Sequence, residues 1–297
     1  MRGGWRPGLV AAAGLAALLL ATGCGDGRVA SARAPAAGGR FDGGAAMRLI
    51  RRQVAYGQRP AGSRALRRLA LRLRPLLPHG RFEPVPGQPR LRNIVGSLPG
   101  RPPAVVLGAH YDTLATPKGF VGANNGAAGS AIVIEAARAL ARLRRPPGAP
   151  ALRFVLFDGE EPARGLPEQH TDFYDAGLRG SRAYVAAHPQ ATRAMLLLDY
   201  VANRGLRLPR EGTSSPALWA RVRRAARRVG AGRVFPAATG TSIIDDHSPF
   251  LRAGVPAVDF IDWSYDGHSL HDGLRRLSPR AADAVGETVV ELLRGWR

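Results

Sequence analysis

The chain alternates short apolar runs with longer segments of helical period, a pattern typical of α/β proteins. Apolar runs that predict strands lie near residues 92–97, 104–109, 152–157, 194–200 and 256–261. Segments with apolar residues at helical spacing lie near 45–56, 61–77, 126–144, 178–188, 215–229 and 279–295. This alternation predicts a mostly parallel sheet with helices on both of its faces.

Polar side chains gather where the predicted strands end. His110 follows the run VVLGA, Glu160 and Glu161 follow LRFVLFDG, Asp199 closes AMLLL, and His268 comes shortly after AVDFI. Open α/β sheets bind ligands beyond the carboxyl ends of their strands, so we expect these side chains to converge at one edge. A single buried histidine or aspartate is more often structural than functional, and the argument therefore depends on the convergence.

The residue types at this edge are those of a catalytic zinc site. Zinc favours histidine nitrogen and carboxylate oxygen, and a catalytic site keeps one position open for water or substrate. The side chains of the neighbours Glu160 and Glu161 point in different directions, so one can bind metal while the other acts as general acid and base. Asp112, two residues after His110, is placed to orient a ligand imidazole from behind.

Length and composition favour one exported domain. The 297 residues, 45% of them hydrophobic, can bury one large core, and no repeat or long polar tract divides them. Residues 1–24 combine early arginines, an apolar run and small residues ending at Cys24, which predicts a signal peptide. Its Ala-Thr-Gly-Cys ending resembles a bacterial lipobox, so we expect lipidation of Cys24; an ordinary secretory signal is the alternative. Residues 25–44, rich in glycine, alanine and arginine, predict a flexible tether before a catalytic domain at 45–297.

The formal charge of +21 does not by itself indicate a nucleic-acid partner. Lys118 is the only lysine, and the arginines are spread among abundant alanine, glycine and proline. Between Arg221 and Arg228 the charges are spaced along an amphipathic helix, which is typical of a solvated face. We therefore expect no nucleic-acid binding, which would call for clustered basic residues.

An ordered series of motifs carries a resemblance to a known family. The series is AHYDT, FVGANNGAAG, FDGEE, GLRGSRAY, LLLDY, DDHSPFL and GHSLHD. In this order the motifs resemble those of the M28 family of zinc aminopeptidases, over about residues 45–297. DDHSPFL, and the DGEE segment followed at a distance by GSR, resemble more narrowly the glutaminyl-peptide cyclotransferase branch. The resemblance implies a single-domain, three-layer α/β/α sandwich with a mostly parallel mixed sheet and zinc at the carboxyl ends of its strands.

The resemblance also implies a set of metal ligands. Glu161 and His268 match zinc ligands, and Asn125 occupies the position of a third, where the family has an aspartate. His110 and Asp199 match the ligands of a second zinc ion in the aminopeptidases, whereas one zinc ion suffices in the cyclotransferases. An amide oxygen is a poorer zinc ligand than a carboxylate and removes a negative charge, so we expect weakened zinc affinity.

The resemblance assigns the acid and base chemistry to Glu160. In the cyclotransferases Asp199 and Asp245 would form a hydrogen-bond network around Glu160, and His247, from the same DDHSPFL segment, would support it. A further departure is Gly267, which stands in GHSLHD where the family usually has tryptophan. We expect this glycine to remove one aromatic wall of the substrate pocket.

These residues are compatible with three functions. The first is a cyclotransferase that converts the N-terminal glutamine of peptides or proteins to pyroglutamate and ammonia, with Glu160 carrying the proton. The second is a zinc aminopeptidase that hydrolyses N-terminal residues, and the third is a non-catalytic peptide-binding lipoprotein, which Asn125 and Gly267 would favour. The branch motifs and the retained acidic residues favour the first, because a buried acidic cluster is costly without metal or partners. We expect zinc as cofactor and membrane attachment through Cys24.

Overall fold

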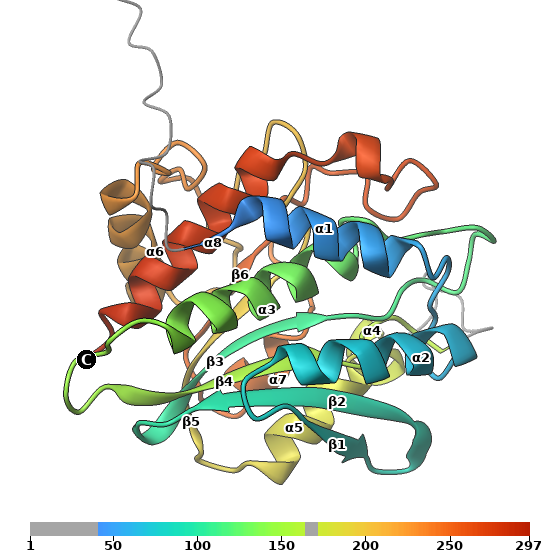
Figure 1. Cartoon of the computed structure of the whole chain (residues 1–297), viewed down its shortest axis with the longest axis horizontal. Coiled ribbons are helices and arrows are strands. Elements are labelled where there is room, and N and C mark those ends of the chain that lie inside the picture. Colours follow the sequence, from blue (N-terminus) through green and yellow to red (C-terminus); the bar gives the residue numbers. More distant parts are fainter. Residues whose placement is uncertain (1–40, 164–171) are drawn as a thin grey trace, which may run out of the picture. The chain divides into compact units, whose positions relative to one another are not determined.

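In residues 41–163 and 172–297, which the computed structural model describes, six strands form one sheet (Figure 1). They are β1 (Arg81–Val85), β2 (Gln88–Leu98), β3 (Arg101–His110), β4 (Pro150–Phe157), β5 (Thr192–Leu198) and β6 (Ala257–Phe260). Their order across the sheet is β1-β2-β4-β3-β5-β6. β4, β3, β5 and β6 pair in parallel. At one edge of the sheet, β2 pairs antiparallel with β4, and β1 pairs antiparallel with β2. The mostly parallel, mixed sheet is confirmed.

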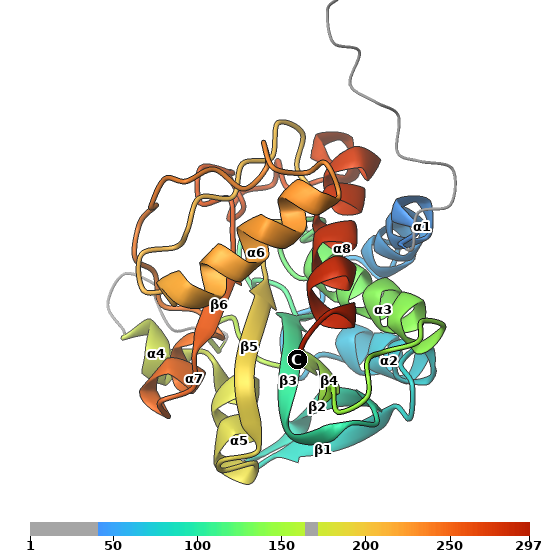
Figure 2. The same cartoon turned by 90° about the vertical axis from the view of Figure 1, so that its left-hand side faces the viewer.

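Helices cover both faces of this sheet. They are α1 (Gly43–Val54), α2 (Arg64–Leu73), α3 (Ala127–Ala141), α4 (Phe173–Ala176), α5 (Arg179–Ala187), α6 (Pro216–Arg228), α7 (Ser248–Arg252) and α8 (Pro279–Arg294), with short 3-10 turns η1 (Arg74–Leu76) and η2 (Leu274–Arg276). Figure 2 shows α1, α3, α6 and α8 on one side of the strands and α5 and α7 on the other. The protein is therefore an α/β/α sandwich, as predicted.

The side chains of the central strands alternate between two hydrophobic clusters. Val105 and Leu107 of β3 pack into the larger cluster with α1, α2, α3, α6 and α8. Val106, between them in sequence, packs into the smaller cluster with Tyr184 of α5 and Phe250 of α7. Because successive strand residues face opposite sides, an unbroken apolar run such as VVL is what a strand covered on both faces requires.

Helix boundaries follow the capping residues that the sequence places there. The hydroxyls of Ser63, Ser215 and Ser278 accept hydrogen bonds from backbone N–H groups in the first turns of α2, α6 and α8. Pro216 and Pro279 occupy the first helical position, where no N–H is needed. The predicted helices near 215–229 and 279–295 are thereby confirmed to within one residue.

Some short elements and boundaries differ from the prediction. β1, α4 and α7 were not predicted, because each is five residues or shorter and too brief to show a period. The predicted tether ends earlier than residue 44, since the Asp42 carboxylate caps α1 and the Phe41 side chain is buried. Cys24, the predicted signal peptide and the rest of the tether lie outside the described residues. Within the described part, no helix is both long and apolar enough to cross a bilayer.

The carboxyl ends of the parallel strands bring the polar residues to one edge. β3 ends at His110, and Asp199 directly follows β5. The turn after β4 carries Glu160 and Glu161. The register of β3 with β4 and β5 fixes these ends side by side, so the predicted convergence is confirmed for these strands.

Candidate metal centre and active site

A cavity of about 330 Å³ opens at the carboxyl ends of the strands. Its polar wall is formed by Asn125, Glu160, Glu161, Asp199, Asp245 and His268. All six were predicted as site residues, and they come from five different segments of the chain. His268 is exposed, whereas the others are buried. We call Asn125, Glu161 and His268, the three positions that match one zinc ion, the rim site.

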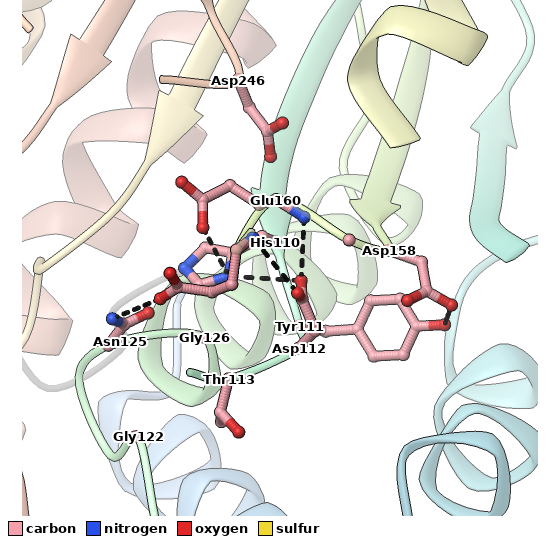
Figure 3. Close-up of polar contacts among 12 residues, drawn as sticks. His110, Tyr111, Asp112, Thr113, Gly122, Asn125, Gly126, Asp158, Glu160 and Asp246 are labelled. Carbon is pink, nitrogen blue, oxygen red and sulfur yellow. Dashed lines mark hydrogen bonds and ion pairs between the residues drawn. The ribbon is translucent and has the colours of Figure 1, made fainter. Parts of the chain in front are cut away.

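His110 lies among the carboxylates of Asp112, Glu160 and Asp199, of which Figure 3 shows the first two. Its Nδ1 is 3.6 Å from an oxygen of Asp112 and 3.6 Å from one of Glu160, and its Nε2 is 3.4 Å from an oxygen of Asp199. Burial by itself would lower the pKa of His110, but the three carboxylates raise it well above its ordinary value. The imidazole therefore favours its protonated form wherever it is not bound to a metal.

Asp112 supports the turn that carries the two glutamates. Its Oδ1 accepts the backbone N–H of Glu160 at 3.2 Å, and its Oδ2 accepts that of Glu161 at 3.3 Å. The same carboxylate faces the imidazole of His110. Asp112 was predicted only to orient the ring of His110. It also fixes the backbone positions of Glu160, the acid/base candidate, and Glu161, a ligand candidate, relative to each other.

Asn125 is held at the start of α3 by its own backbone. Its N–H donates to Asp272 at 2.9 Å, and the N–H of Asn124 donates to the other oxygen of the same carboxylate at 2.8 Å. Gly126 follows with a φ of 92°, and a Cβ there would lie 2.2 Å from the carbonyl oxygen of Asp112. Only glycine permits this close approach, which brings Asn125 into the cavity wall.

The rim site contains donors that suit zinc. The Asn125 Nδ2 donates to Glu161 Oε1 at 2.8 Å, which leaves Asn125 Oδ1 buried and without a hydrogen-bond partner in the described part of the chain. A buried amide oxygen without a donor is costly, and a cation would satisfy it. With the carboxylate of Glu161 and the imidazole of His268, the set comprises two oxygen donors and one nitrogen donor, which fits zinc.

Glu160 combines burial with a concentration of negative charge. Burial and the neighbouring Glu161 raise the pKa of Glu160 well above its ordinary value, although His110 acts in the opposite direction. Burial and Asp199 also raise the pKa of Asp245, to about 6. A carboxyl group that can hold or release a proton near neutral pH is what acid and base catalysis needs.

Comparison with known protein families shows where the chain belongs. The model of peptidase family M28 matches residues 93–293.

The chain belongs to peptidase family M28.

Solved M28-like structures cover most of the chain. A glutaminyl cyclase from Tannerella forsythia is 26% identical with a TM-score of 0.75, over 86% of this chain and 99% of that one. A leucine aminopeptidase precursor from Bacteroides thetaiotaomicron is 25% identical with a TM-score of 0.74, over 86% of this chain and 98% of that one. A glutaminyl-peptide cyclotransferase-like protein of Mus musculus is 26% identical over 57% of this chain and 50% of its own length. The chain thus spans about half the length of the curated relative that it matches.

The pocket of this M28 protein has aromatic walls despite Gly267. Tyr200 and Trp263 both line the cavity, with stacked rings whose centroids lie 6.3 Å apart. A Cβ at position 267 would lie 2.4 Å from the ring of Tyr200, so this ring occupies the space that a side chain at 267 would need. The expected loss of an aromatic wall is therefore wrong, because residues elsewhere in the chain provide it.

A second group of metal-type side chains lies deeper than the rim site and was only partly predicted. Asp245, His247 and Asp259 have ligand atoms within 4.8 Å of one another, and we call them the buried cluster. Asp259 was missed because it stands within the apolar run AVDF and reads as a strand interior position. In the described part of the chain, this is the only group of three histidine, cysteine or acidic side chains that meets this spacing.

Two further acidic residues at this end were missed. Glu211 contacts His247, with Oε2 3.3 Å from Nε2, so His247 is braced from a loop before α6. The Asp246 carboxylate is buried; burial and Asp245 raise its pKa well above the ordinary value, although the Ser181 hydroxyl acts in the opposite direction. The doubled aspartate of DDHSPFL could have indicated Asp246, whereas no motif marks Glu211.

Proposed function

We propose that this M28 protein is a zinc-dependent glutaminyl-peptide cyclotransferase that acts on peptides or proteins with N-terminal glutamine. The observation that carries the proposal is the position of Glu160, a buried carboxyl group of raised pKa in the same cavity wall as the rim site. The similarity to bacterial glutaminyl cyclases, with cover of nearly their whole length, supports the same activity.

The rim site would hold one zinc ion through Asn125, Glu161 and His268. Bound there, zinc would supply a Lewis acid that polarises the side-chain carbonyl of the substrate glutamine. Glu160 takes a proton from the substrate's α-amine, whose nitrogen then forms a bond to the side-chain carbonyl carbon. This new bond closes the pyroglutamate ring, and Glu160 returns the proton to the side-chain amide nitrogen, which leaves as ammonia when its bond to the carbonyl carbon breaks.

The chain's remaining residues would orient these reactants. Asp112 fixes the backbone of Glu160 and thereby the direction of its carboxylate. Asp245 lies in the same wall and keeps negative charge near Glu160, which favours the protonated form that donates to the leaving group. Tyr200 and Trp263 form an apolar wall that excludes water from the glutamine side chain. Trp263, half-exposed, would contact the residue that follows the glutamine.

Asn125 favours the cyclotransferase over a dinuclear aminopeptidase. A carboxylate at this position can bridge two metal ions with its two oxygens, whereas an amide offers one oxygen and no charge. His110 and Asp199, the other candidates for a second zinc ion, contact each other at 3.4 Å. The aminopeptidase remains the second candidate because a leucine aminopeptidase precursor is equally similar in structure.

The test uses the full chain supplied with zinc and two peptides that begin with glutamine and with leucine. Loss of ammonia from the glutamine peptide alone, read by mass spectrometry, is the expected result. Release of the first residue from the leucine peptide would establish the aminopeptidase instead. If zinc binds and both peptides survive, the non-catalytic peptide-binding protein replaces the proposal. Glu160→Gln serves as the inactive control.

The proposal places the enzyme outside the cytoplasm, attached to the membrane by a lipid on Cys24. Export rests on the sequence of residues 1–24 alone. Cys24→Ser tests the anchor, since the variant should leave the membrane fraction while the wild-type chain stays in it. Equal fractionation of the two would reduce the prediction to an ordinary secretory signal.

A further inference from the structure

The buried cluster brings three metal-type ligands together away from the rim site. Asp245 and His247 precede α7, and Asp259 lies in β6. His247 and Asp259 are 0% exposed and Asp245 is 4% exposed. The ligand atoms lie within 4.8 Å of one another, although the two segments are separated by a helix and a turn. The fold therefore gathers two carboxylates and one imidazole in the protein interior.

The imidazole of His247 is oriented by a carboxylate on its far side. Glu211 accepts hydrogen bonds from the backbone of Thr213 at 2.9 Å, of Ser214 at 2.8 Å and of Ile243 at 3.0 Å. The hydroxyl of Thr213 also donates to Glu211, and its oxygen lies 2.8 Å from His247 Nε2. Since that hydroxyl hydrogen is directed to Glu211, its oxygen accepts the Nε2–H of His247. The other ring nitrogen, Nδ1, is thereby left as an acceptor.

The hydrogen bonds that Glu211 accepts support this orientation, because the backbone N–H groups of Thr213, Ser214 and Ile243 hold its carboxylate beside Nε2 of His247. A carboxylate behind a histidine sets the tautomer of that histidine and increases its strength as a ligand, as in many zinc sites. Glu211, His247 and the two aspartates have this arrangement.

Three acceptors therefore face one another. His247 Nδ1 is buried and has no hydrogen-bond partner in the described part of the chain; it lies 3.8 Å from Asp259 Oδ2. Both carboxylate oxygens of Asp259, and Oδ2 of Asp245, are likewise buried without an N–H or O–H donor there, and the two carboxyl groups can hydrogen-bond to each other only when one is protonated. Two ionised carboxylates at this spacing repel each other, and a cation bound by both and by Nδ1 would reverse the interaction.

We propose that Asp245, His247 and Asp259 bind a divalent metal ion, with zinc as the ion that the donor set suits, at a site separate from the rim site. Two carboxylates and one histidine match the donors of protein zinc sites. Ligand atoms about 2 Å from one ion lie at most ~4 Å apart, so binding draws the three side chains slightly closer. Asp245 also lines the cavity, which gives the ion a path from solvent.

The ion has a structural role next to the active site. It connects the segment before α7 to strand β6. It thereby holds the side chain of Asp245 in place from the side that faces away from the cavity. It also offsets part of the negative charge that Asp245 places near Glu160. The site is closed by protein on all sides except the cavity wall, as structural metal sites are.

The test measures zinc content and thermal stability of the full chain after removal and return of zinc. In the variant Glu161→Gln/His268→Gln, which lacks two rim-site ligands, we expect about one zinc ion per chain and a zinc-dependent rise in Tm. Adding Asp259→Asn should abolish both. Adding Asp259→His instead should retain both, because a histidine nitrogen is also a zinc ligand.

Two controls separate metal binding from loss of folding or of charge. Adding Glu135→Gln removes a carboxylate that pairs with Arg138 on α3, and should change neither the zinc content nor the rise in Tm. Adding Glu211→Gln should weaken zinc affinity about 10-fold to 100-fold, because Glu211 orients His247, while the amide oxygen of the variant can still accept backbone hydrogen bonds that Glu211 accepts. Circular dichroism without zinc verifies the fold of each variant.

Two results would overturn the proposal. One is the absence of bound zinc in the Glu161→Gln/His268→Gln variant, and the other is zinc that persists after Asp259→Asn. In either case a proton shared between Asp245 and Asp259 would account for the geometry. Since the readout is metal content, neither result depends on whether the chain is a cyclotransferase.

Discussion

The rim site and the buried cluster both offer two oxygen donors and one histidine, but they differ in enclosure. The rim site opens into the cavity, and its His268 is exposed. The buried cluster lies in the interior, and Glu211 supports its histidine from behind. An open ligand set suits catalysis, since a substrate must reach the metal, whereas a closed one suits a structural role. Similar ligands on one sheet edge can therefore serve different purposes according to solvent access.

The largest expected effect tests which region performs the chemistry. Glu160→Gln should lower the rate of ammonia release about 10²-fold to 10⁴-fold, because the amide cannot carry the proton. Zinc content should not change, since Glu160 belongs to neither ligand set. Rates with a saturating glutamine peptide and metal analysis on the same sample provide the measurement. A rate within a few-fold of wild type would remove Glu160 from the acid/base role; Glu135→Gln is the matched control.

A second substitution should make the rim site bind zinc more tightly than the buried cluster does. Asn125→Asp should raise zinc affinity ~10-fold or more, because it restores an anionic ligand. Without zinc the same variant should be less stable than wild type, since the hydrogen bond of 2.8 Å from Asn125 to Glu161 becomes a contact between two carboxylates. Zinc titration followed by thermal unfolding measures both effects. Unchanged zinc affinity would show that, in this fold, the amide of Asn125 binds zinc as tightly as an aspartate does.

The aromatic wall beside the rim site gives a stability prediction. Gly267→Ala should cost about 1–3 kcal/mol of unfolding free energy, because the new Cβ overlaps the Tyr200 ring. In the Tyr200→Leu background, with a smaller and more flexible side chain, the same substitution should cost less. Chemical unfolding of the four proteins gives a double-mutant cycle. Additive effects would mean that the two residues do not compete for this space.

The smallest expected effect concerns Asp158, at the end of the same strand as the glutamates. Burial and the charge of Asp112 raise its pKa to about 7, against 3.8 as the ordinary value. Between these pH values the folded state binds the proton and the unfolded state does not. The stability that this provides is fully present below pH 3.8 and is lost as the pH rises through about 7.

Asp158→Asn should therefore reduce the loss of stability between about pH 5 and about pH 8, by ~1 kcal/mol. The buried Oδ1 of Asp158 has no hydrogen-bond partner among the described residues, so the amide nitrogen of the variant would also lack an acceptor. This unpaired donor would offset part of the stability that the variant gains at the higher pH. Thermal unfolding at both pH values measures the difference. A pH dependence identical to that of wild type would assign it to the other buried carboxyl groups.

The sequence predicted the parts of the site that follow strands directly. His110 and Asp199 close or follow buried apolar runs, which are easy to recognise, and the glutamates follow such a run within a short turn. The position of His268 is less direct: it lies in a loop, and only the resemblance to M28 motifs indicated its role. Loop conformation depends on contacts from distant segments, so spacing alone does not place a residue in a loop.

The sequence did not indicate residues whose role depends on contacts with distant parts of the chain. Glu211 stands in no motif, and its relation to His247 arises because a loop before α6 packs against the segment before α7. The pairing of Tyr200 with Gly267 joins a strand end to a loop, so the departure at Gly267 was misread as a missing wall. Both relations consist of contacts between residues far apart in the chain.

Apolar periodicity and chain order by themselves predicted the layered α/β fold and the sheet edge where the polar residues gather, and the resemblance of the ordered motifs indicated the family. Local propensity and the burial of strands on both faces suffice for this, because they depend on neighbouring residues. Only the tertiary structure decided which polar side chains share a cavity wall and which lie behind it. It also decided that Asp259 faces Asp245 and His247. Such decisions depend on strand register and loop packing, which bring together residues that the sequence keeps apart.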